Sequence, residues 1–133
     1  MRAIIFDYFG VLAGSYGHCD SEIMQFIERE LYGKYKLAVL SNMSSGSPAE
    51  MLGDYMKLFE QVIISGDLGV AKPDKRAFLE AARRLEEFPS DCLMIDDSQE
   101  NCAGAERAGM GAIYYTSLEG LRQSLVKYDI LAP

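Results

Sequence analysis

The chain has 133 residues, of which 49% are hydrophobic, so it is long enough to fold as one domain, 1–133, around a single core. Its formal net charge of −7 argues against nucleic acid and anionic membranes as partners, because both are negatively charged. Three cysteines, an odd number without metal-ligand spacing, fit reduced thiols in the cytoplasm. We expect neither a signal peptide nor a membrane-spanning run, because the chain opens on a short strand-like segment.

The first predicted element is a strand over 3–6, which runs directly into Asp7 and is followed by Gly10. An apolar run without alternation is typical of a strand that is buried on both faces. Asp7 then lies at the carboxyl end of the strand, which is the edge where ligands bind in an open parallel sheet. There it could act as a nucleophile or a metal ligand, or it could simply cap a turn.

The next elements are a helix and a strand. Asp20 or Ser21 caps the helix, which carries apolar residues at helical spacing and ends at Gly33. The apolar run 37–40 predicts a second strand, and it leads into Ser41-Asn42. A hydroxyl and an amide therefore follow this strand, as a carboxylate follows the first one.

The middle of the chain repeats this strand–helix alternation. A capping box, Ser-Pro-Ala-Glu, starts the helix predicted over 47–59. The run 62–64 predicts the third strand, and 65–71 is predicted as a loop. Lys72 follows this loop, and Pro73 is predicted to begin the next helix.

The last part contains two more strands and two more helices. The run 93–95 predicts a fourth strand that ends in Asp96-Asp97-Ser98. A helix rich in small residues follows, and Gly109 ends it. The fifth strand is predicted over 112–114, and Ser117 caps the final helix.

Five short apolar strands that alternate with five amphipathic helices indicate an α/β fold. The expected architecture is a three-layer sandwich with a five-stranded, parallel, Rossmann-like sheet. Because parallel crossovers are right-handed, helices are expected on both faces of this sheet.

Polar groups suited to one chemistry follow four of the five strands. A parallel sheet brings these strand ends to one edge, where carboxylates could bind a divalent cation and a hydroxyl and a lysine could bind phosphate. Lys72 precedes a predicted helix N-terminus, where a cation is disfavoured unless an anion is bound nearby. Taken singly, each group could instead serve a turn or a helix cap. The groups are Asp7, Ser41-Asn42, Lys72 and Asp96-Asp97.

These residues also form four motifs that resemble, in order, those of the haloacid dehalogenase-like (HAD) superfamily of hydrolases. Each motif lies at a predicted strand end, and together they span nearly the whole chain. The matching stretches are Phe6-Asp7 with Gly10-Val11-Leu12, Leu40-Ser41-Asn42, Gly69-Val70-Ala71-Lys72-Pro73-Asp74 with Phe78, and Ile95-Asp96-Asp97-Ser98 with Asn101.

The resemblance implies a nucleophile and a phosphate-binding site. Asp7 would attack phosphorus and form an aspartyl-phosphate, which water then hydrolyses. Ser41 and Lys72 would act with it by holding the phosphoryl oxygens, and Asn42 would also contact the substrate.

The resemblance also implies a Mg²⁺ site beside the nucleophile. Asp7, Asp97 and the backbone carbonyl of Phe9 would bind the ion directly. Asp96 would support the metal or its waters, and Asn101 would brace the loop.

The chain departs from the family pattern in two ways. Phosphatases of the family carry a second Asp, the general acid/base, two residues after the nucleophile, and here that residue is Phe9. Family members also commonly insert a cap domain after the first motif or after the third strand. Here the corresponding segments, 13–19 and 65–71, are too short to fold as domains, so we expect a minimal form without a cap and with an open site.

Three functions remain open at this point. The first is a Mg²⁺-dependent phosphohydrolase that acts on a small phosphorylated substrate or a phosphorylated macromolecule. The second is an inactive relative that binds a phosphorylated ligand or a protein, which Phe9 favours. The third is a dehalogenase, which needs no metal and would leave Asp96 and Asp97 idle near an anionic substrate. The intact Asp7, Lys72 and acid pair favour the first.

Overall fold

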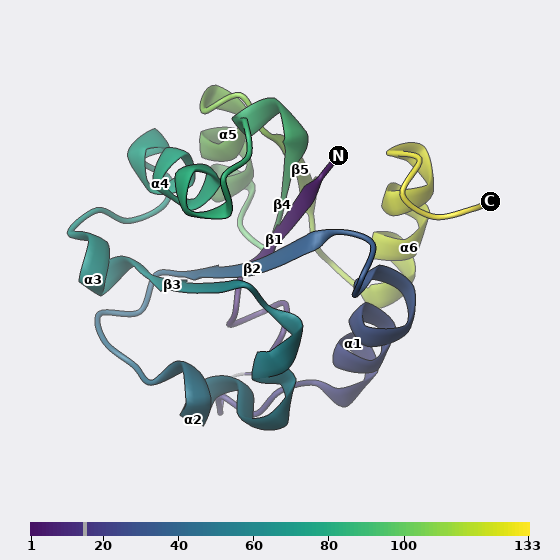
Figure 1. Cartoon of the computed structure of the whole chain (residues 1–133), viewed down its shortest axis with the longest axis horizontal. Helices are drawn as coiled ribbons and strands as arrows, with labels where there is room; N and C mark the ends of the chain where they lie inside the picture. Colours follow the sequence, from purple (N-terminus) through teal and green to yellow (C-terminus); the bar gives the residue numbers. More distant parts are fainter. Residues whose placement is uncertain (15) are drawn as a thin grey trace.

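The computed structural model describes residues 1–14 and 16–133, and its centre is one five-stranded sheet (Figure 1). The strand order is β3-β2-β1-β4-β5, and every neighbouring pair is parallel, as predicted. The strands are β1 (Ala3–Phe6), β2 (Lys36–Ser41), β3 (Gln61–Ile64), β4 (Cys92–Asp96) and β5 (Gly111–Tyr114).

The sheet register aligns the strand ends that carry the candidate site. Phe6 of β1 pairs with Val39 of β2 and with Ile95 of β4. Asp7 therefore leaves the central strand beside Asp96, and its backbone N–H donates to the carbonyl of Ile95 at 2.9 Å. The central position of β1 places Asp7 between the ends of its two neighbours.

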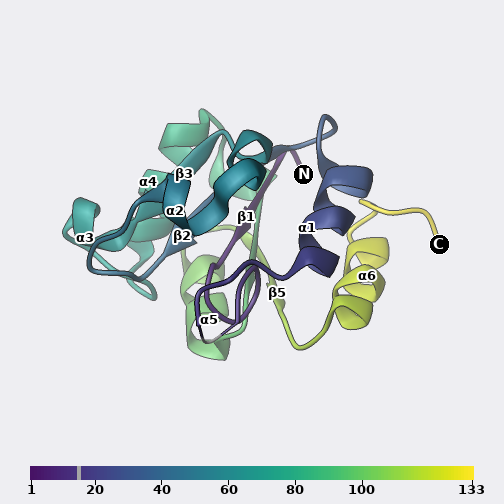
Figure 2. The ribbon, with the colours of Figure 1, turned by 90° about the horizontal axis from the view of Figure 1, so that it is seen from below.

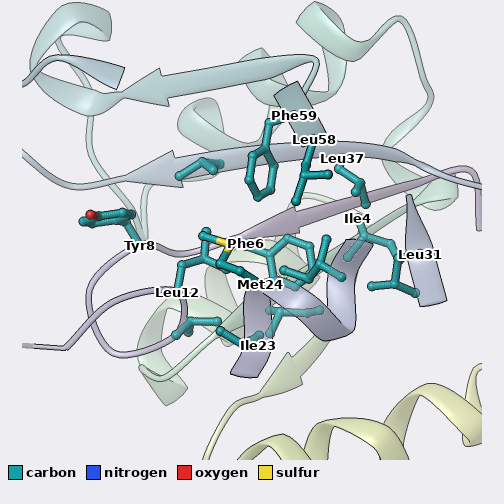
Figure 3. Close-up of a cluster of buried hydrophobic side chains, with 14 of the residues drawn as sticks. Ile4, Phe6, Tyr8, Leu12, Ile23, Met24, Leu31, Leu37, Leu58 and Phe59 are labelled. Carbon is teal, nitrogen blue, oxygen red and sulfur yellow. The ribbon is translucent and has the colours of Figure 1, made fainter. Parts of the chain in front are cut away.

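Both faces of the sheet are buried, which confirms the expectation from the apolar runs. Ile4 and Phe6 point into one core, and Ala3 and Ile5 point into the other, because successive side chains of a strand alternate. Figure 3 shows side chains of the first core, among them Ile4 and Phe6.

The helices cover the two faces and complete the predicted three layers (Figures 1 and 2). The helices α1 (Ser21–Phe26), α2 (Pro48–Leu52) and α6 (Leu118–Lys127) contribute to the first core, and α1 and α6 lie side by side. The helices α4 (Lys75–Leu85) and α5 (Gln99–Arg107) contribute to the second.

Two predicted helices are each divided. Asp20 is the N-cap of α1, which passes into a π-helical turn, η1 (Ile27–Leu31). Ser47 caps α2, which gives way to a 3₁₀-helix, η2 (Gly53–Leu58). Gly53 has a φ of +53°, a conformation that ends an α-helix and that glycine adopts without strain.

The helix predicted to begin at Pro73 is α4, and its predicted start was wrong by two residues. Asp74 is the N-cap of α4, and its side chain accepts from the N–H of Arg76 at 2.9 Å. Pro73 therefore lies outside the helix, because the capping carboxylate, not the proline, satisfies the free N–H groups. Ser98 and Ser117 cap α5 and α6, and a short 3₁₀-helix, η3 (Pro89–Asp91), precedes β4.

The two segments where a cap domain could be inserted are short in the structure. The described residues between β1 and α1 form only isolated bridges, at Phe9–Ala13 and Ala13–Cys19. The predicted loop after β3 contains a four-residue helix, α3 (Ser65–Leu68). Within the described part of the chain neither segment forms a cap, and no helix there is both long and apolar enough to cross a membrane.

Candidate active site

Three carboxylates and a serine meet at the carboxyl edge of the sheet. One side-chain oxygen each of Asp7, Asp96 and Asp97 lies within 4.8 Å of the others. Ser41, the last residue of β2, is buried and lines a cavity of about 340 Å³ with Asp7 and Lys72. The strand ends therefore bring together the residues that the motifs predict.

Lys72 lies between two of these carboxylates. Its Nζ is 2.9 Å from Oδ1 of Asp7 and 2.8 Å from Oδ2 of Asp96, and its side chain is fully buried. Burying an ammonium group is unfavourable unless it is paired and hydrogen-bonded, and here two carboxylates supply both conditions. The lysine is thus held directly beside the candidate nucleophile.

Asn42 positions the backbone of this lysine. Its side-chain oxygen accepts from the N–H of Lys72 at 3.0 Å, and its amide NH₂ donates to the carbonyl of Lys72 at 2.9 Å. Asn42 also lines the cavity, where it could reach a substrate. Its predicted contact with substrate stays a prediction. The sequence held no signal for the backbone clamp, since 30 residues separate its two sides.

Asp96 is fully buried, and its oxygens are already engaged. Beyond Lys72, it accepts from the backbone N–H of Ser98 at 3.0 Å and from the amide of Asn101 at 3.2 Å. These contacts leave it better suited to orienting the site than to binding a metal directly. They also agree with the predicted bracing role of Asn101.

Asp97 is exposed and rests against Gly10. A Cβ on Gly10 would lie 2.1 Å from Oδ2 of Asp97, so only glycine leaves room for the carboxylate there. Gly10 also has a φ of +89°, which other residues rarely adopt. Among the described residues, no hydrogen bond reaches the carbonyl oxygen of Phe9, the third predicted metal ligand.

Gly10→Ala should therefore destabilise the fold by about 1–2 kcal/mol through its positive φ and should also displace Asp97. Gly33→Ala is the matched control, because Gly33 has a φ of +85° with nothing within 4 Å of an added Cβ. Urea unfolding should show a loss in both variants, and only Gly10→Ala should also weaken Mg²⁺ binding. Equal Mg²⁺ affinity in the two variants would contradict a role for Asp97 as ligand.

The electrostatics of the cluster fit a divalent cation. Burial raises the pKa of Asp7 to about 7, with the negative charge of Asp96 adding to the rise and Lys72 opposing it. Three carboxylates face one lysine, so a negative charge remains that a divalent cation would neutralise. Hard oxygen donors are also what Mg²⁺ prefers.

Tyr8 is a site component that sequence reasoning missed. Its ring is buried, and its hydroxyl lies 2.6 Å from the carbonyl of Gly17 and 2.7 Å from that of Met51. It thereby ties the loop after β1 to α2. In the sequence Tyr8 is one more residue of the apolar stretch after Asp7, and no motif or spacing there indicates this contact.

Comparison with curated proteins finds partial relatives. The chain is 43% identical over 53 residues to a glyceraldehyde 3-phosphate phosphatase of Methanopyrus kandleri, which covers 39% of this chain and 23% of that protein. It is 36% identical over 64 residues to a bifunctional riboflavin kinase/FMN phosphatase of Arabidopsis thaliana, which covers 48% and 17%. The chain therefore spans less than a quarter of the length of either relative.

Solved structures resemble the whole fold. A crystal structure of an uncharacterized protein of Corynebacterium glutamicum matches with a TM-score of 0.81 and 28% identity, over 100% of this chain and 98% of that chain. A 2-haloacid dehalogenase of Pseudomonas syringae matches with a TM-score of 0.69 and 28% identity, over 84% and 54%.

A protein-family model shows to which family the chain belongs. The model described as haloacid dehalogenase-like hydrolase matches residues 20–109, which include the second, third and fourth motifs. The first motif lies outside this match, but Asp7 joins the other three motifs in the site through Lys72 and the carboxylate cluster. The chain belongs to the haloacid dehalogenase-like hydrolase family.

Proposed function

We propose that this single-domain chain is a Mg²⁺-dependent phosphohydrolase that acts through an aspartyl-phosphate on Asp7. The main support is the position of Lys72, which is buried between Asp7 and Asp96. Its Nζ is 2.9 Å from Oδ1 of Asp7 and 2.8 Å from Oδ2 of Asp96, and the exposed Asp97 lies beside them. This arrangement offers a carboxylate nucleophile, a cation for phosphoryl oxygens and acidic ligands for a metal. The phosphatase names of the two partial relatives support the same chemistry.

In the first step, an oxygen of Asp7 attacks phosphorus. A bond forms between this oxygen and phosphorus, while the bond to the leaving-group oxygen breaks and the leaving group takes the electron pair. Lys72 and Ser41 hold phosphoryl oxygens during the transfer, and Asn42 keeps the Lys72 backbone in place. Water then attacks the aspartyl-phosphate, which releases inorganic phosphate and restores the carboxylate.

Asp7, Asp97 and the carbonyl of Phe9 would hold the Mg²⁺ ion, and Asp96 would orient the groups around it. When bound, Mg²⁺ neutralises carboxylate charge and polarises the phosphoryl oxygens. The open site among the described residues suits a small phosphorylated substrate, and it would also admit a phosphorylated group on a larger molecule.

The direct test is a phosphatase screen with and without Mg²⁺, run on ester and acyl phosphates. We expect phosphate release that requires Mg²⁺, and a covalent phosphate on the protein that mass spectrometry detects after acid quenching. A complex with Mg²⁺ and beryllium fluoride, which mimics the phosphoryl group on Asp7, should also form. Turnover without Mg²⁺ dependence would contradict the proposal.

Mg²⁺ alone should stabilise the folded protein, because it binds the carboxylate cluster only when the cluster is assembled. At a concentration 100 times its Kd, the gain is about 2.7 kcal/mol, measurable as a rise in melting temperature. Asp97→Asn should remove most of this gain, whereas Asp54→Asn, at an exposed carboxylate of η2, should retain it. A wild-type melting temperature that does not respond to Mg²⁺ would refute the metal site.

A dehalogenase remains the second enzymatic candidate, since a 2-haloacid dehalogenase is among the structural neighbours. A dehalogenase uses no metal, so its anionic substrate would directly face the carboxylates of Asp7, Asp96 and Asp97. That repulsion favours the phosphohydrolase. Chloride release from a 2-chloro acid, without Mg²⁺, would reverse the order of the two candidates.

A further inference from the structure

Phe9 forms an exposed aromatic wall of the cavity that holds the candidate nucleophile. It follows Asp7 by two residues, and 41% of its surface is exposed. The cavity of about 340 Å³ is lined by Phe9 and Met43 together with Asp7 and Lys72. An apolar ring therefore faces the same cavity as the candidate nucleophile and would lie beside a group bound there.

The ring of Phe9 has a fixed neighbour. It packs edge-to-face against Tyr8, with ring centroids 5.0 Å apart and an interplanar angle of 82°. Tyr8 is buried and anchored through its hydroxyl to Gly17 and Met51. A Cβ on Gly17 would lie 3.7 Å from the Phe9 ring, so the loop packs near the ring as well. Phe9 is thus supported as a wall, although much of it faces solvent.

This wall offers no proton to a leaving group. Among the described residues that line the cavity, only Asp7 and Lys72 carry an ionisable side chain, and these two pair with each other. An adjoining cavity of about 360 Å³ shares Asn42 and Met43 with the first, and none of its lining side chains titrates near neutral pH.

Asp96 and Asp97 lie beside Asp7 in the carboxylate cluster that would hold Mg²⁺, and the remaining nearby groups face elsewhere. His18 and Cys19 line a different cavity, between the loop after β1 and α2. The hydroxyl of Tyr8 is turned to the backbone carbonyls of Gly17 and Met51, away from the cavity. None of the described residues that line this cavity offers a proton beyond the paired Asp7 and Lys72, so a leaving group at Phe9 departs as an anion and takes its proton from water.

We propose that the substrates of this site are aryl phosphates, in which phosphate is carried on a phenolic oxygen. The inference rests on the proposed phosphohydrolase function. A phenolate is stable enough to leave with the electron pair of the broken phosphorus–oxygen bond, whereas an alkoxide needs a positioned acid, which contributes about 10²- to 10⁴-fold. The ring of the phenol can also pack against Phe9 and Met43, an interaction that an alkyl group of similar charge does not gain.

The test compares kcat/KM for three kinds of substrate with Mg²⁺: phenyl phosphates with phenols of graded acidity, ethyl phosphate and acetyl phosphate. For the wild type we expect kcat/KM to rise steeply with the acidity of the phenol. We also expect kcat/KM for ethyl phosphate to be at least about 100-fold lower than for phenyl phosphate. Acetyl phosphate has a good leaving group without a ring, so it reports the phosphohydrolase chemistry alone. Free phosphotyrosine and a tyrosine-phosphorylated peptide, run in parallel, separate small-molecule from protein-borne aryl phosphates.

Two variants of Phe9 separate the effect of lacking a proton donor from the effect of the aromatic ring. Phe9→Asp supplies an acid, so it should raise ethyl phosphate turnover by about 10²- to 10⁴-fold and flatten the dependence on phenol acidity. Phe9→Leu is the apolar control: it should leave that dependence steep and lower kcat/KM for phenyl phosphate by about 2- to 10-fold relative to acetyl phosphate, mainly through KM. Circular dichroism checks that both variants are folded.

The outcomes discriminate this inference from the proposed function. Acetyl phosphate hydrolysis with ethyl phosphate cleaved as fast as phenyl phosphate would overturn the aryl preference and keep the phosphohydrolase. No turnover of any of the substrates with Mg²⁺ would overturn the phosphohydrolase itself. If Phe9→Asp fails to fold, the wild-type series and Phe9→Leu still decide the question.

Discussion

Asp7→Asn should abolish the turnover of every phosphorylated substrate, with a loss on the order of 10⁴-fold or more. The amide has nearly the shape of the carboxylate but cannot form an acyl phosphate, so the first bond to phosphorus is lost. Steady-state assays give the rate, and mass spectrometry should find the covalent phosphate in the wild type and not in the variant. Turnover that survives at full rate would show that another group, or a contaminant, performs the reaction.

The same substitution should not weaken the fold, which separates a chemical loss from unfolding. Burial raises the pKa of Asp7 from 3.8 to about 7, so the folded protein holds a proton there that the unfolded chain has released. The stability that protonated Asp7 contributes is present below about pH 4 and is lost as the pH rises through about 7. In Mg²⁺-free buffer at pH 8, Asp7→Asn should therefore be at least as stable as the wild type, and the difference should shrink toward pH 4. Urea unfolding at both pH values provides the measurement.

The sheet could be predicted from the sequence because each strand is a short apolar run without alternation. Ala3 to Phe6 shows the reason: both sets of side chains meet a core, so no polar residue interrupts the pattern. The strand ends were equally readable, since Asp7 and Asp96 end their apolar runs with a carboxylate. The haloacid dehalogenase-like membership inferred from the motifs at these ends is confirmed by the family match.

The division of the helices could not be predicted from the same patterns. Apolar spacing over 21–33 fits a single helix, but the backbone changes from α to π at Ile27. The helix predicted over 47–59 changes to 3₁₀ at Gly53. Apolar periodicity specifies which face is buried, and it distinguishes poorly between helical forms that bury the same face.

The internal contacts of the site were also hidden from the sequence. Asn42 bonds to the backbone of Lys72, and Tyr8 bonds to the carbonyl of Met51. Both contacts join segments that only the assembled fold brings together. The sequence therefore indicated which residues gather at the sheet edge, and the structure adds how they hold one another.

Lys72→Met should cause a large loss of folding stability, because it removes the cation from between two buried carboxylates. Breaking a buried ion pair by removing one partner typically costs about 3–5 kcal/mol. Lys36→Met is the matched control, since Lys36 also pairs with a carboxylate, Glu87 at 3.6 Å, but its side chain is 34% exposed. That variant should lose only about 1 kcal/mol. Urea unfolding at pH 8 in Mg²⁺-free buffer measures both.

Two further measurements tie this loss to the carboxylates that Lys72 contacts. Lowering the pH to 5 should shrink the loss in Lys72→Met, because Asp7 then takes up a proton and one uncompensated charge disappears. Mg²⁺ should stabilise the variant more than it stabilises the wild type, since the ion replaces part of the missing positive charge. The variant should nevertheless bind the Mg²⁺–beryllium fluoride complex about 10- to 100-fold more weakly, because its phosphoryl oxygens lose a charged donor. If Lys72→Met is as stable as Lys36→Met at both pH values, the two ion pairs of Lys72 do not contribute to folding stability, and its predicted role of holding the carboxylates together is wrong.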